Sequence, residues 1–401
     1  MLRTQFAICK CFFTNNIFIK EYNMHVTYQG REQFLHDYSE VLQSKGCHNL
    51  ELLLPKLEAE SLRRKHLHDN SWKRQLKVSK EYKPMHPQIF TLQPSFLAPR
   101  FHEIVKCSQE DKQTLEGIAS CIESHQNRIY SFPVFTEEFC QLFLEEIRNF
   151  EESPLPKGRP NTMNQYGINL DELGFDSLIS NLRTTYITPL TRLLFPDVGG
   201  DSLDSHKAFI VTYKEGEDVD LDYHFDNAEV TLNVSLNEDY SDGDLYFGPM
   251  RTEISNQRFG YTHKLGKGLL HRGQQLHGAL PISDGVRYNL IVWMRSSQVR
   301  NELCPMCDEK PILVPVKHGY GDGFIDQKQC SIGFYRRIVI FLNVIIIKRS
   351  ILQSNIVVPL IQIYKDQGNF RELIFLLFGQ LLGHNPIYLI QLSISTVKMQ
   401  N

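Results

Sequence analysis

Short β-rich runs separated by glycine and aspartate turns fill the stretch from Lys207 to Met294, and they constrain the fold more than any other feature. The runs are Ala208–Tyr213, Val230–Leu236, Asp244–Phe247, Gly268–Leu270 and Tyr288–Met294. Short strands closed by such turns are typical of a sandwich or jelly roll. Because helical patterns precede them, we predict an α+β fold in which helices support a β-rich core.

Two amphipathic segments lie before this core. Thr136 to Phe150 is predicted to be a helix, with Thr136 as its N-cap and Glu137 and Glu138 in the first turn. A second helix is expected over 178–194, with Pro189 as a kink or a break. The polar residues 30–84 are also expected to be helical.

These patterns divide the chain into five regions. We predict a mainly helical region over 1–130, a helical buttress over 131–200, the jelly-roll core over 201–300, a cysteine-containing extension over 301–330 and an atypical apolar tail over 331–401. The tail contains only nine charged residues in 71, and its apolar stretches are too short for a bilayer span. We expect this end of the chain to be disordered, or to be a mis-predicted sequence such as a translated intron, and to carry no function. A weak contact with a membrane surface is the alternative.

The charge balance argues against one class of partner. The chain carries −3 and the tail +5, so the first 330 residues carry −8, which disfavours a nucleic-acid substrate. Nine cysteines are too few for a disulfide scaffold, and their odd number argues against complete pairing. We therefore expect an intracellular protein, in the cytoplasm or the nucleus.

His224 and Asp226 form an H-x-D motif. In an extended segment, residues i and i+2 point to the same face, so an imidazole and a carboxylate can converge on one metal ion. The motif is weak by itself, because His and Asp alternate by chance in many sequences, and two solvated loop residues are the simpler interpretation. A third ligand must come from elsewhere, and the downstream candidates are His263, His271 and His277.

A metal held by two histidines and one carboxylate keeps open coordination positions, as in non-heme Fe(II) oxygenases. A dicarboxylate such as 2-oxoglutarate would bind that metal with one end and need a cation at the other, a role that suits the planar, always charged arginine. Arg287 follows His277 by ten residues, whereas the other two candidates have Pro and Gly at that distance. The spacing favours His277 and leaves His271 as a structural, hydrogen-bonded residue.

Residues 208–297 resemble the Fe(II)- and 2-oxoglutarate-dependent dioxygenase domain of the prolyl 4-hydroxylase type. That family's motif is H-x-D, then a second His after a long interval, then Lys or Arg ten positions later. Here the motif reads His224, Asp226, His277 and Arg287. Further segments are similar to members of the family, from roughly residue 5 to 330: CKCFFTNN (9–16), KGRPNTMNQYG (157–167), LDSHKAF (203–209), HFDNAEVTLNVSLN (224–237), LYFG (245–248), LLHRGQQLHGA (269–279) and VRNELCPMC (299–307).

The resemblance implies a double-stranded β-helix (jelly-roll) core with flanking N-terminal helices, and it implies roles for single residues. His224, Asp226 and His277 are expected to bind Fe(II), Arg287 to anchor 2-oxoglutarate, and Tyr213 to form a hydrogen bond to that cosubstrate. The implied reaction couples oxidative decarboxylation of 2-oxoglutarate by O₂ to hydroxylation of an unknown substrate, with a protein side chain among the candidates. L-ascorbate (vitamin C), which reduces the iron after uncoupled turnover, is implied as a further cofactor.

Arg287 departs from the Lys that is common in collagen-type prolyl hydroxylases. The substitution keeps a cation for the far carboxylate of the cosubstrate but weighs against a prolyl substrate.

Two other classes of function stay open. The fold alone does not exclude a catalytically inactive jelly-roll interaction module, although such a module has no physical reason to keep Arg287. Cys304 and Cys307 form one half of a zinc pair. The other half would have to be His318 and Cys330, at irregular spacing.

Overall fold

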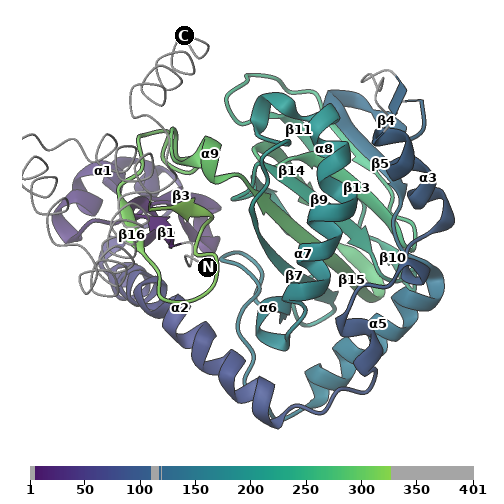
Figure 1. The fold of residues 1–401 in the computed structure, drawn as a ribbon. Coiled ribbons are helices and arrows are strands. Elements are labelled where there is room, and N and C mark those ends of the chain that lie inside the picture. Colours follow the sequence, from purple (N-terminus) through teal and green to yellow (C-terminus); the bar gives the residue numbers. More distant parts are fainter. Residues whose placement is uncertain (1–4, 110–116, 119, 327–401) are drawn as a thin grey trace, which may run out of the picture. The chain divides into compact units, whose positions relative to one another are not determined.

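Eight strands between residues 205 and 295 form two antiparallel sheets (Figure 1). The computed structural model describes residues 5–109, 117–118 and 120–326. The first sheet contains β7 (Ser205–Lys214), β15 (Ile282–Arg295), β9 (Val230–Ser235) and β13 (Lys267–Arg272), and the second contains β8 (Leu221–His224), β14 (Gln275–Ala279), β11 (Leu245–Met250) and β12 (Phe259–Tyr261). Apart from the β11–β12 hairpin and the short β10 (Tyr240–Asp242), successive strands alternate between the sheets. This is the strand order of a jelly roll, so the predicted core is confirmed.

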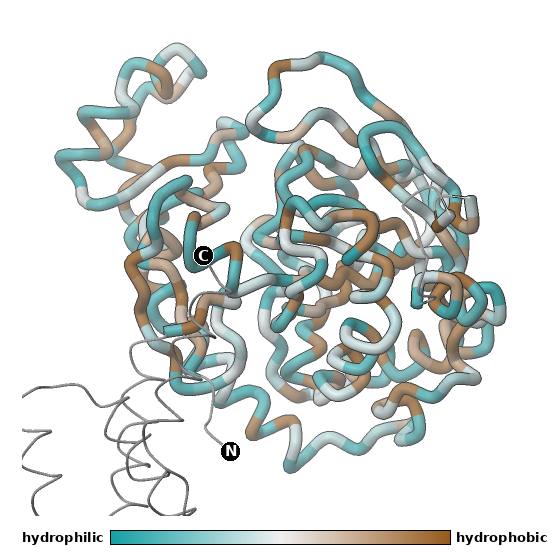
Figure 2. The backbone as a smooth tube through the Cα atoms, turned by 45° about the horizontal axis from the view of Figure 1, so that its top comes forward, coloured by the Kyte–Doolittle hydropathy of each residue, from teal (hydrophilic) through white to brown (hydrophobic). Residues whose placement is uncertain are grey.

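The space between the two sheets is an apolar core built from alternate residues of the strands. On β7, Phe209, Val211 and Tyr213 point into this core beside Phe247 of β11. Ile210, between them, belongs instead to a second cluster under the helices. Figure 2 shows apolar segments, in brown, along the strands and helices of this region.

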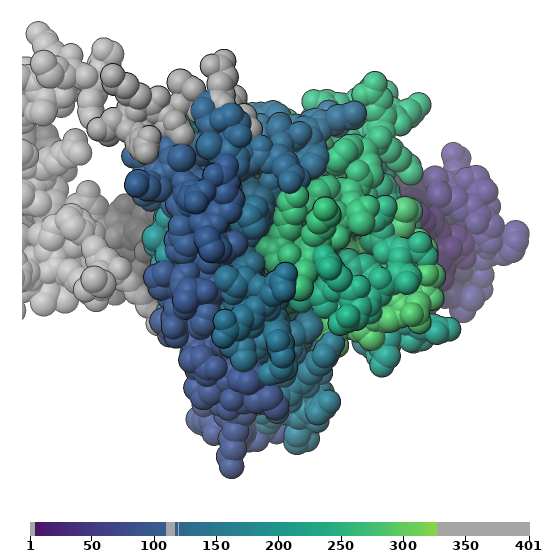
Figure 3. Space-filling view, turned by 90° about the vertical axis from the view of Figure 1, so that its right-hand side faces the viewer, coloured from purple at the N-terminus to yellow at the C-terminus, as the bar shows by residue number. Residues whose placement is uncertain are grey.

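Helices cover the outer face of the first sheet. The apolar cluster there joins residues of the sheet to α3 (Pro99–Ser108), α5 (Glu137–Glu152), α7 (Asp176–Asn181) and α8 (Thr188–Leu194). In the space-filling view of Figure 3, atoms of the earlier, helical part of the chain, in blue, lie beside atoms of the later, β-rich part, in green. The helix predicted from Thr136 is confirmed, because the Thr136 side chain accepts a hydrogen bond from the backbone N–H of Phe139 at the first turn of α5.

The helix predicted over 178–194 is interrupted before Pro189 rather than at it. After α7, residues Leu182–Ile187 form a π-helical segment, and α8 begins at Thr188 with Pro189 in its first turn. Proline lacks an N–H group, and its ring clashes with the carbonyl four residues earlier in an α-helix. The wider π turn relieves that clash, so the helical path continues through the proline.

Three further strands extend the first sheet at its two edges. β6 (Gly167–Asn169) pairs with β7, while β5 (Ile129–Pro133) pairs with β13 and β4 (Glu123–His125) pairs with β5. Gly167 is required at its position, because its φ is 136° and a Cβ atom would lie 2.0 Å from the Ile210 carbonyl oxygen.

The N-terminal part has a small core of its own. The hairpin of β2 (Ile17–Ile19) and β3 (Met24–Val26) packs with α1 (Arg31–Ser44) and the start of α2 (Leu54–Glu81). Arg64 of α2 is buried and donates hydrogen bonds to the carbonyl oxygens of Phe12, Asn15 and Asn16. Further along α2, Arg74 forms an ion pair with Glu172 of α6 (Leu170–Leu173). The long helix therefore fastens the N-terminal loop to the helical layer.

The first strand lies beside the residues that follow the jelly roll. β1 (Phe6–Cys9) is the middle strand of a three-stranded sheet, between β16 (Leu313–Pro315) and β17 (Phe324–Ile325). The short helix α9 (Ser297–Arg300) connects β15 to this region. Sequence patterns gave no sign of this pairing between the beginning of the chain and residues 313–325.

Residues Arg3–Gln327 form one compact unit. The predicted limits of the regions within it, at 130, 200, 300 and 330, stay predictions. The tail over 331–401 lies outside the described residues. None of the helices in the described part of the chain is long and apolar enough to cross a bilayer.

Candidate metal and cosubstrate site

Strands β8 and β14 hold two histidines side by side. His224, the last residue of β8, lies directly opposite His277 of β14, and their ring centroids are 4.3 Å apart. Asp226 follows β8 in a loop, where its backbone N–H donates to the Gly273 carbonyl at 2.8 Å. The metal-binding atoms of these three side chains lie within 4.8 Å of one another. The structure thus brings together the residues that the H-x-D motif and the Arg287 spacing singled out.

Hydrogen bonds orient both imidazoles toward Asp226. The Nδ1 atom of His224 lies 2.7 Å from the Asp222 carbonyl oxygen, and that of His277 lies 2.9 Å from the Gln275 carbonyl oxygen. Because a carbonyl only accepts, Nδ1 carries the proton in each ring and Nε2 keeps its lone pair. The two Nε2 atoms lie 3.7 and 3.6 Å from the oxygens of Asp226.

Burial sets the protonation states of this cluster. Burial and the neighbouring His277 lower the pKa of His224 to about 4. Burial also lowers the pKa of His277 to about 4, so both imidazoles are neutral at pH 7. Burial raises the pKa of the Asp226 carboxyl, which reflects the cost of an isolated buried carboxylate. A divalent cation removes that cost, and two neutral imidazoles with one carboxylate form the donor set of the facial triad.

Arg287 lies at the other end of the same interior. It is 1% exposed, and on β15 it stands directly opposite Tyr213 of β7. Its Nε donates to the Asn289 side-chain oxygen at 2.7 Å, and its Nη1 donates to the Gly243 carbonyl. The guanidinium carbon lies 5.2 Å from the centre of the Tyr213 ring. These contacts fix the orientation of the guanidinium group without neutralising its charge.

Two other fully buried arginines have acidic partners. Arg300 pairs with Glu229 at 2.8 Å, and Arg295 lies 3.7 Å from a carboxylate oxygen of Asp322. Arg287 has no such ion pair among the described residues, and burial lowers its pKa. A buried cation without an anion is costly. The site is therefore complementary to a negatively charged ligand.

Two cavities meet at this cluster. The smaller, about 70 Å³, is lined by Tyr213, Arg287 and the three clustered side chains. The larger, about 580 Å³, has His224 in its wall together with residues of α2 and of the N-terminal loop. A short dicarboxylate between Arg287 and the histidines would lie in the first, which leaves the second for another substrate.

The other two candidate histidines do not join the cluster. His271 is buried, its Nδ1 bonds to the Arg272 carbonyl at 2.9 Å, and its ring centroid lies 4.8 Å from that of His277. This agrees with the structural role expected for it. The Nε2 atom of His263 lies 3.1 Å from the Asn289 side-chain nitrogen, on the Arg287 side of the interior.

Sequence reasoning missed the polar residues that support the site. Thr231 of β9 donates to Asp226 at 2.6 Å, and Asn289 of β15 donates to the Asn233 side-chain oxygen at 2.6 Å while it accepts from Arg287. A signal for them was present. Thr231 and Asn233 occupy alternate positions of a strand that is otherwise apolar, as expected for residues that face a polar interior site.

For the zinc alternative at the C-P-M-C segment of 304–307, the structure does not support His318 as a partner. The ring of His318 stacks on an indole of α2 instead, and Cys330 lies outside the described residues. The sulfur atoms close to Cys304 and Cys307 belong to Cys9 and Cys11. The reason is the pairing of β1 with β16, which brings the two ends of the described chain together.

Comparison with known proteins identifies relatives of this chain. The family model of the OGFOD2-like domain matches residues 78–200. The 2-oxoglutarate and iron-dependent oxygenase domain-containing protein 2 of Xenopus tropicalis is 51% identical over 328 residues, which cover 80% of this chain and 94% of that protein. The Homo sapiens protein of the same name is 44% identical over 336 residues, which cover 82% and 96%.

A more distant relative is the multifunctional procollagen lysine hydroxylase and glycosyltransferase LH3 of Rattus norvegicus. It is 30% identical over 176 residues, which cover 41% of this chain and 23% of that protein. The near-complete coverage of the first two relatives confirms the predicted relationship. The chain belongs to the family of the 2-oxoglutarate and iron-dependent oxygenase domain-containing protein 2.

Proposed function

We propose that this protein, a non-heme iron dioxygenase that uses 2-oxoglutarate and O₂, hydroxylates an amino-acid side chain of another protein. Its dependence on iron and 2-oxoglutarate is that of its family. One observation carries the assignment of the site: the clustered His224, Asp226 and His277 share a cavity with a buried arginine that has no acidic partner among the described residues.

The three clustered side chains are the iron ligands. Their Nε2 atoms and one carboxylate oxygen face one another, and each Nδ1 is already engaged by a backbone carbonyl. The Thr231 hydroxyl holds one oxygen of Asp226, so the carboxylate enters the site with a fixed orientation. When bound, iron and 2-oxoglutarate together supply the oxidising power for hydroxylation, which protein side chains alone lack.

Arg287 binds the far carboxylate of 2-oxoglutarate. Its remaining N–H groups offer the planar donor pair that a carboxylate accepts. Tyr213, opposite it, supplies a hydroxyl within the same cavity, and that hydroxyl lies 3.5 Å from the side-chain nitrogen of Asn164. The cosubstrate is therefore held at both ends, and the apolar core around the cavity keeps bulk water out.

The larger cavity supports a side-chain substrate. Its wall contains Asp171, whose Oδ1 is buried without a hydrogen-bond partner and whose pKa burial raises to about 7. The amine of a substrate would satisfy that oxygen. One relative carries procollagen lysine hydroxylase in its name, so lysine is the first side chain to test.

The proposal also covers the reductant that the protein uses and its location in the cell. L-ascorbate would serve as the reductant that keeps iron bound by His224, Asp226 and His277 in the ferrous state. The protein works inside the cell, because its buried thiols, such as those of Cys47 and Cys140, are not in disulfides.

The test measures succinate formed by iron-loaded protein, with and without lysine-containing peptides, and the gain of one oxygen atom by the peptide. We expect His224→Ala and Asp226→Ala to abolish both signals, and His36→Ala, at an exposed position of α1, to leave both unchanged. Turnover that survives the first two variants would refute the ligand assignment. A wild-type protein that binds neither iron nor 2-oxoglutarate would instead be the inactive interaction module.

A further inference from the structure

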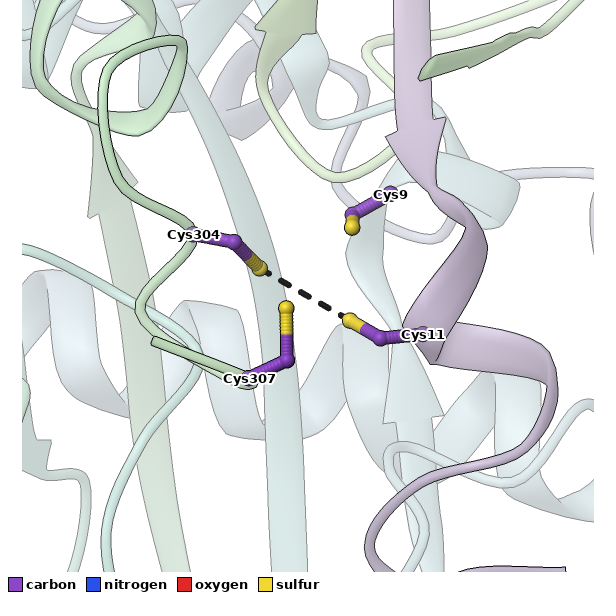
Figure 4. Close-up of side chains that lie close together, drawn as sticks. All are labelled: Cys9, Cys11, Cys304 and Cys307. Carbon is purple, nitrogen blue, oxygen red and sulfur yellow. Dashed lines mark hydrogen bonds between the residues drawn. The ribbon is translucent and has the colours of Figure 1, made fainter. Parts of the chain in front are cut away.

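Four cysteine side chains from the two ends of the described chain meet at one point. Cys9 is the last residue of β1, and Cys11 follows in the short 3₁₀ turn Lys10–Phe13. Cys304 and Cys307 lie in the loop after α9. The four sulfur atoms lie within 4.8 Å of one another, and Figure 4 shows all four side chains directed toward a common centre. The iron-site assignment uses none of them.

The sulfur spacing fits a tetrahedral metal and excludes a disulfide. With metal–sulfur bonds of about 2.3 Å, two ligands of a tetrahedral zinc ion lie about 3.8 Å apart. The Sγ atoms of Cys11 and Cys304 are 3.7 Å apart. A disulfide needs about 2.05 Å between its sulfur atoms. All four side chains are thiols in the structure.

Backbone groups prepare these thiols to act as ligands. The loop around Cys304 is closed by two hydrogen bonds of 2.9 Å, one from its own N–H to the Glu309 carbonyl and one from the Asp308 N–H to its carbonyl. These bonds hold the loop in shape and so orient the Cys304 side chain, as the supporting residues of metal sites do.

Apolar packing immediately around the four cysteines is limited. The buried cluster there contains only four residues, Ala7, Cys9, Cys304 and Phe324. The sheet beside it has strands of four, three and two residues, β1, β16 and β17. A structural zinc ion at this point would contribute folding free energy directly.

We propose that Cys9, Cys11, Cys304 and Cys307 bind a structural Zn²⁺ ion that joins the N-terminal strand to the segment after the jelly roll. Four thiolates fill the tetrahedral coordination sphere, so the ion has no open position for catalysis. Each pair, C-x-C and C-x-x-C, supplies two neighbouring ligands, and the fold brings the two pairs together. Cys9, Cys11 and Cys304 also line the large cavity that reaches His224, so the ion holds one wall of the proposed substrate space in place.

Metal analysis of the full-length protein, purified without chelators, tests the proposal. We expect one zinc ion per chain in the wild-type protein. The double variants Cys304→Ser/Cys307→Ser and Cys9→Ser/Cys11→Ser should each lose that zinc. The control Cys47→Ser, at a buried cysteine outside the cluster, should keep it. His318→Ala should also keep its zinc. His224→Ala should lose iron but keep zinc, which separates this proposal from the iron-site assignment. Zinc that stays at one per chain in both double variants would overturn the proposal.

Cobalt substitution gives a second readout that needs no variant. Wild-type protein depleted of zinc and loaded with Co²⁺ should show the intense thiolate-to-cobalt absorption of a tetrahedral four-sulfur site, and added Zn²⁺ should remove it. Zinc depletion should also lower the thermal unfolding midpoint, and zinc should restore it. An absent thiolate–cobalt band, an iron–thiolate spectrum in the protein as isolated, or disulfides within the cluster would each refute the zinc site.

Discussion

Replacing Arg287 with methionine is the sharpest test of the cosubstrate site. The side chain is 1% exposed, and two of its five N–H groups are engaged, by Asn289 and Gly243. The three that remain are available to a carboxylate of 2-oxoglutarate. Because Arg287 forms no ion pair with the described residues, methionine removes a partner of the ligand without breaking a salt bridge of the protein.

The magnitude follows from the buried position. Truncating one partner of a buried charge pair costs about 2–5 kcal/mol. We take about 3 kcal/mol from this range, because the guanidinium group is held in a fixed orientation but two of its donors are already in use. This free energy corresponds to about 150-fold weaker binding of 2-oxoglutarate. At a ligand concentration of 100 times the wild-type Kd, binding stabilises the wild-type protein by about 2.7 kcal/mol. The same concentration would stabilise the variant by only about 0.3 kcal/mol.

The assay is thermal or denaturant unfolding with and without 2-oxoglutarate, in the presence of Mn²⁺ and without O₂. The ligand-free variant should be at least as stable as the wild type, because a buried unpaired charge has been removed. Arg287→Lys should be intermediate, since it keeps the charge but loses the planar donor pair. Arg100→Met, at an exposed position, should behave like the wild type. An undiminished 2-oxoglutarate shift in Arg287→Met would show that the anion binds elsewhere.

The remaining predictions concern residues that stabilise the site and the fold. Thr231→Val should weaken iron binding by about 10–100-fold with little loss of stability, because it removes the hydrogen bond that orients Asp226; unchanged iron affinity by titration would contradict this. Gly273→Ala should destabilise the protein by about 1–3 kcal/mol in urea unfolding, because its Cβ would lie 2.0 Å from the Ala228 carbonyl oxygen; a neutral result would mean that the loop can move freely. Burial lowers the pKa of His206 to about 3, so the unfolded chain binds one more proton below about pH 6.5, and the free energy of unfolding should fall as the pH drops from there toward 3. His206→Gln should remove up to one proton from that slope, and an identical pH dependence of the two proteins would exclude His206 as its source.

The strands of the apolar core could be predicted from the sequence. Five predicted runs correspond to β7, β9, β11, β13 and β15, because alternating or continuous apolar residues mark strands that pack on a core. The strands β8 and β14, which carry His224 and His277, were not predicted as runs. They are short and polar, and they take extended form through pairing with each other and with β11.

The sequence by itself determined the chemistry of the site: an imidazole and a carboxylate two residues apart, a second imidazole, and an arginine ten residues after it. The H-x-D spacing is local, and an extended backbone places residues two apart on the same side. Only the tertiary structure decided that His224 faces His277, that Arg287 is buried without an ion pair to a described residue, and that Cys11 meets Cys304 across 293 residues. Sheet pairing brings such positions together through backbone hydrogen bonds, which are the same for every residue type and so leave no local pattern to read.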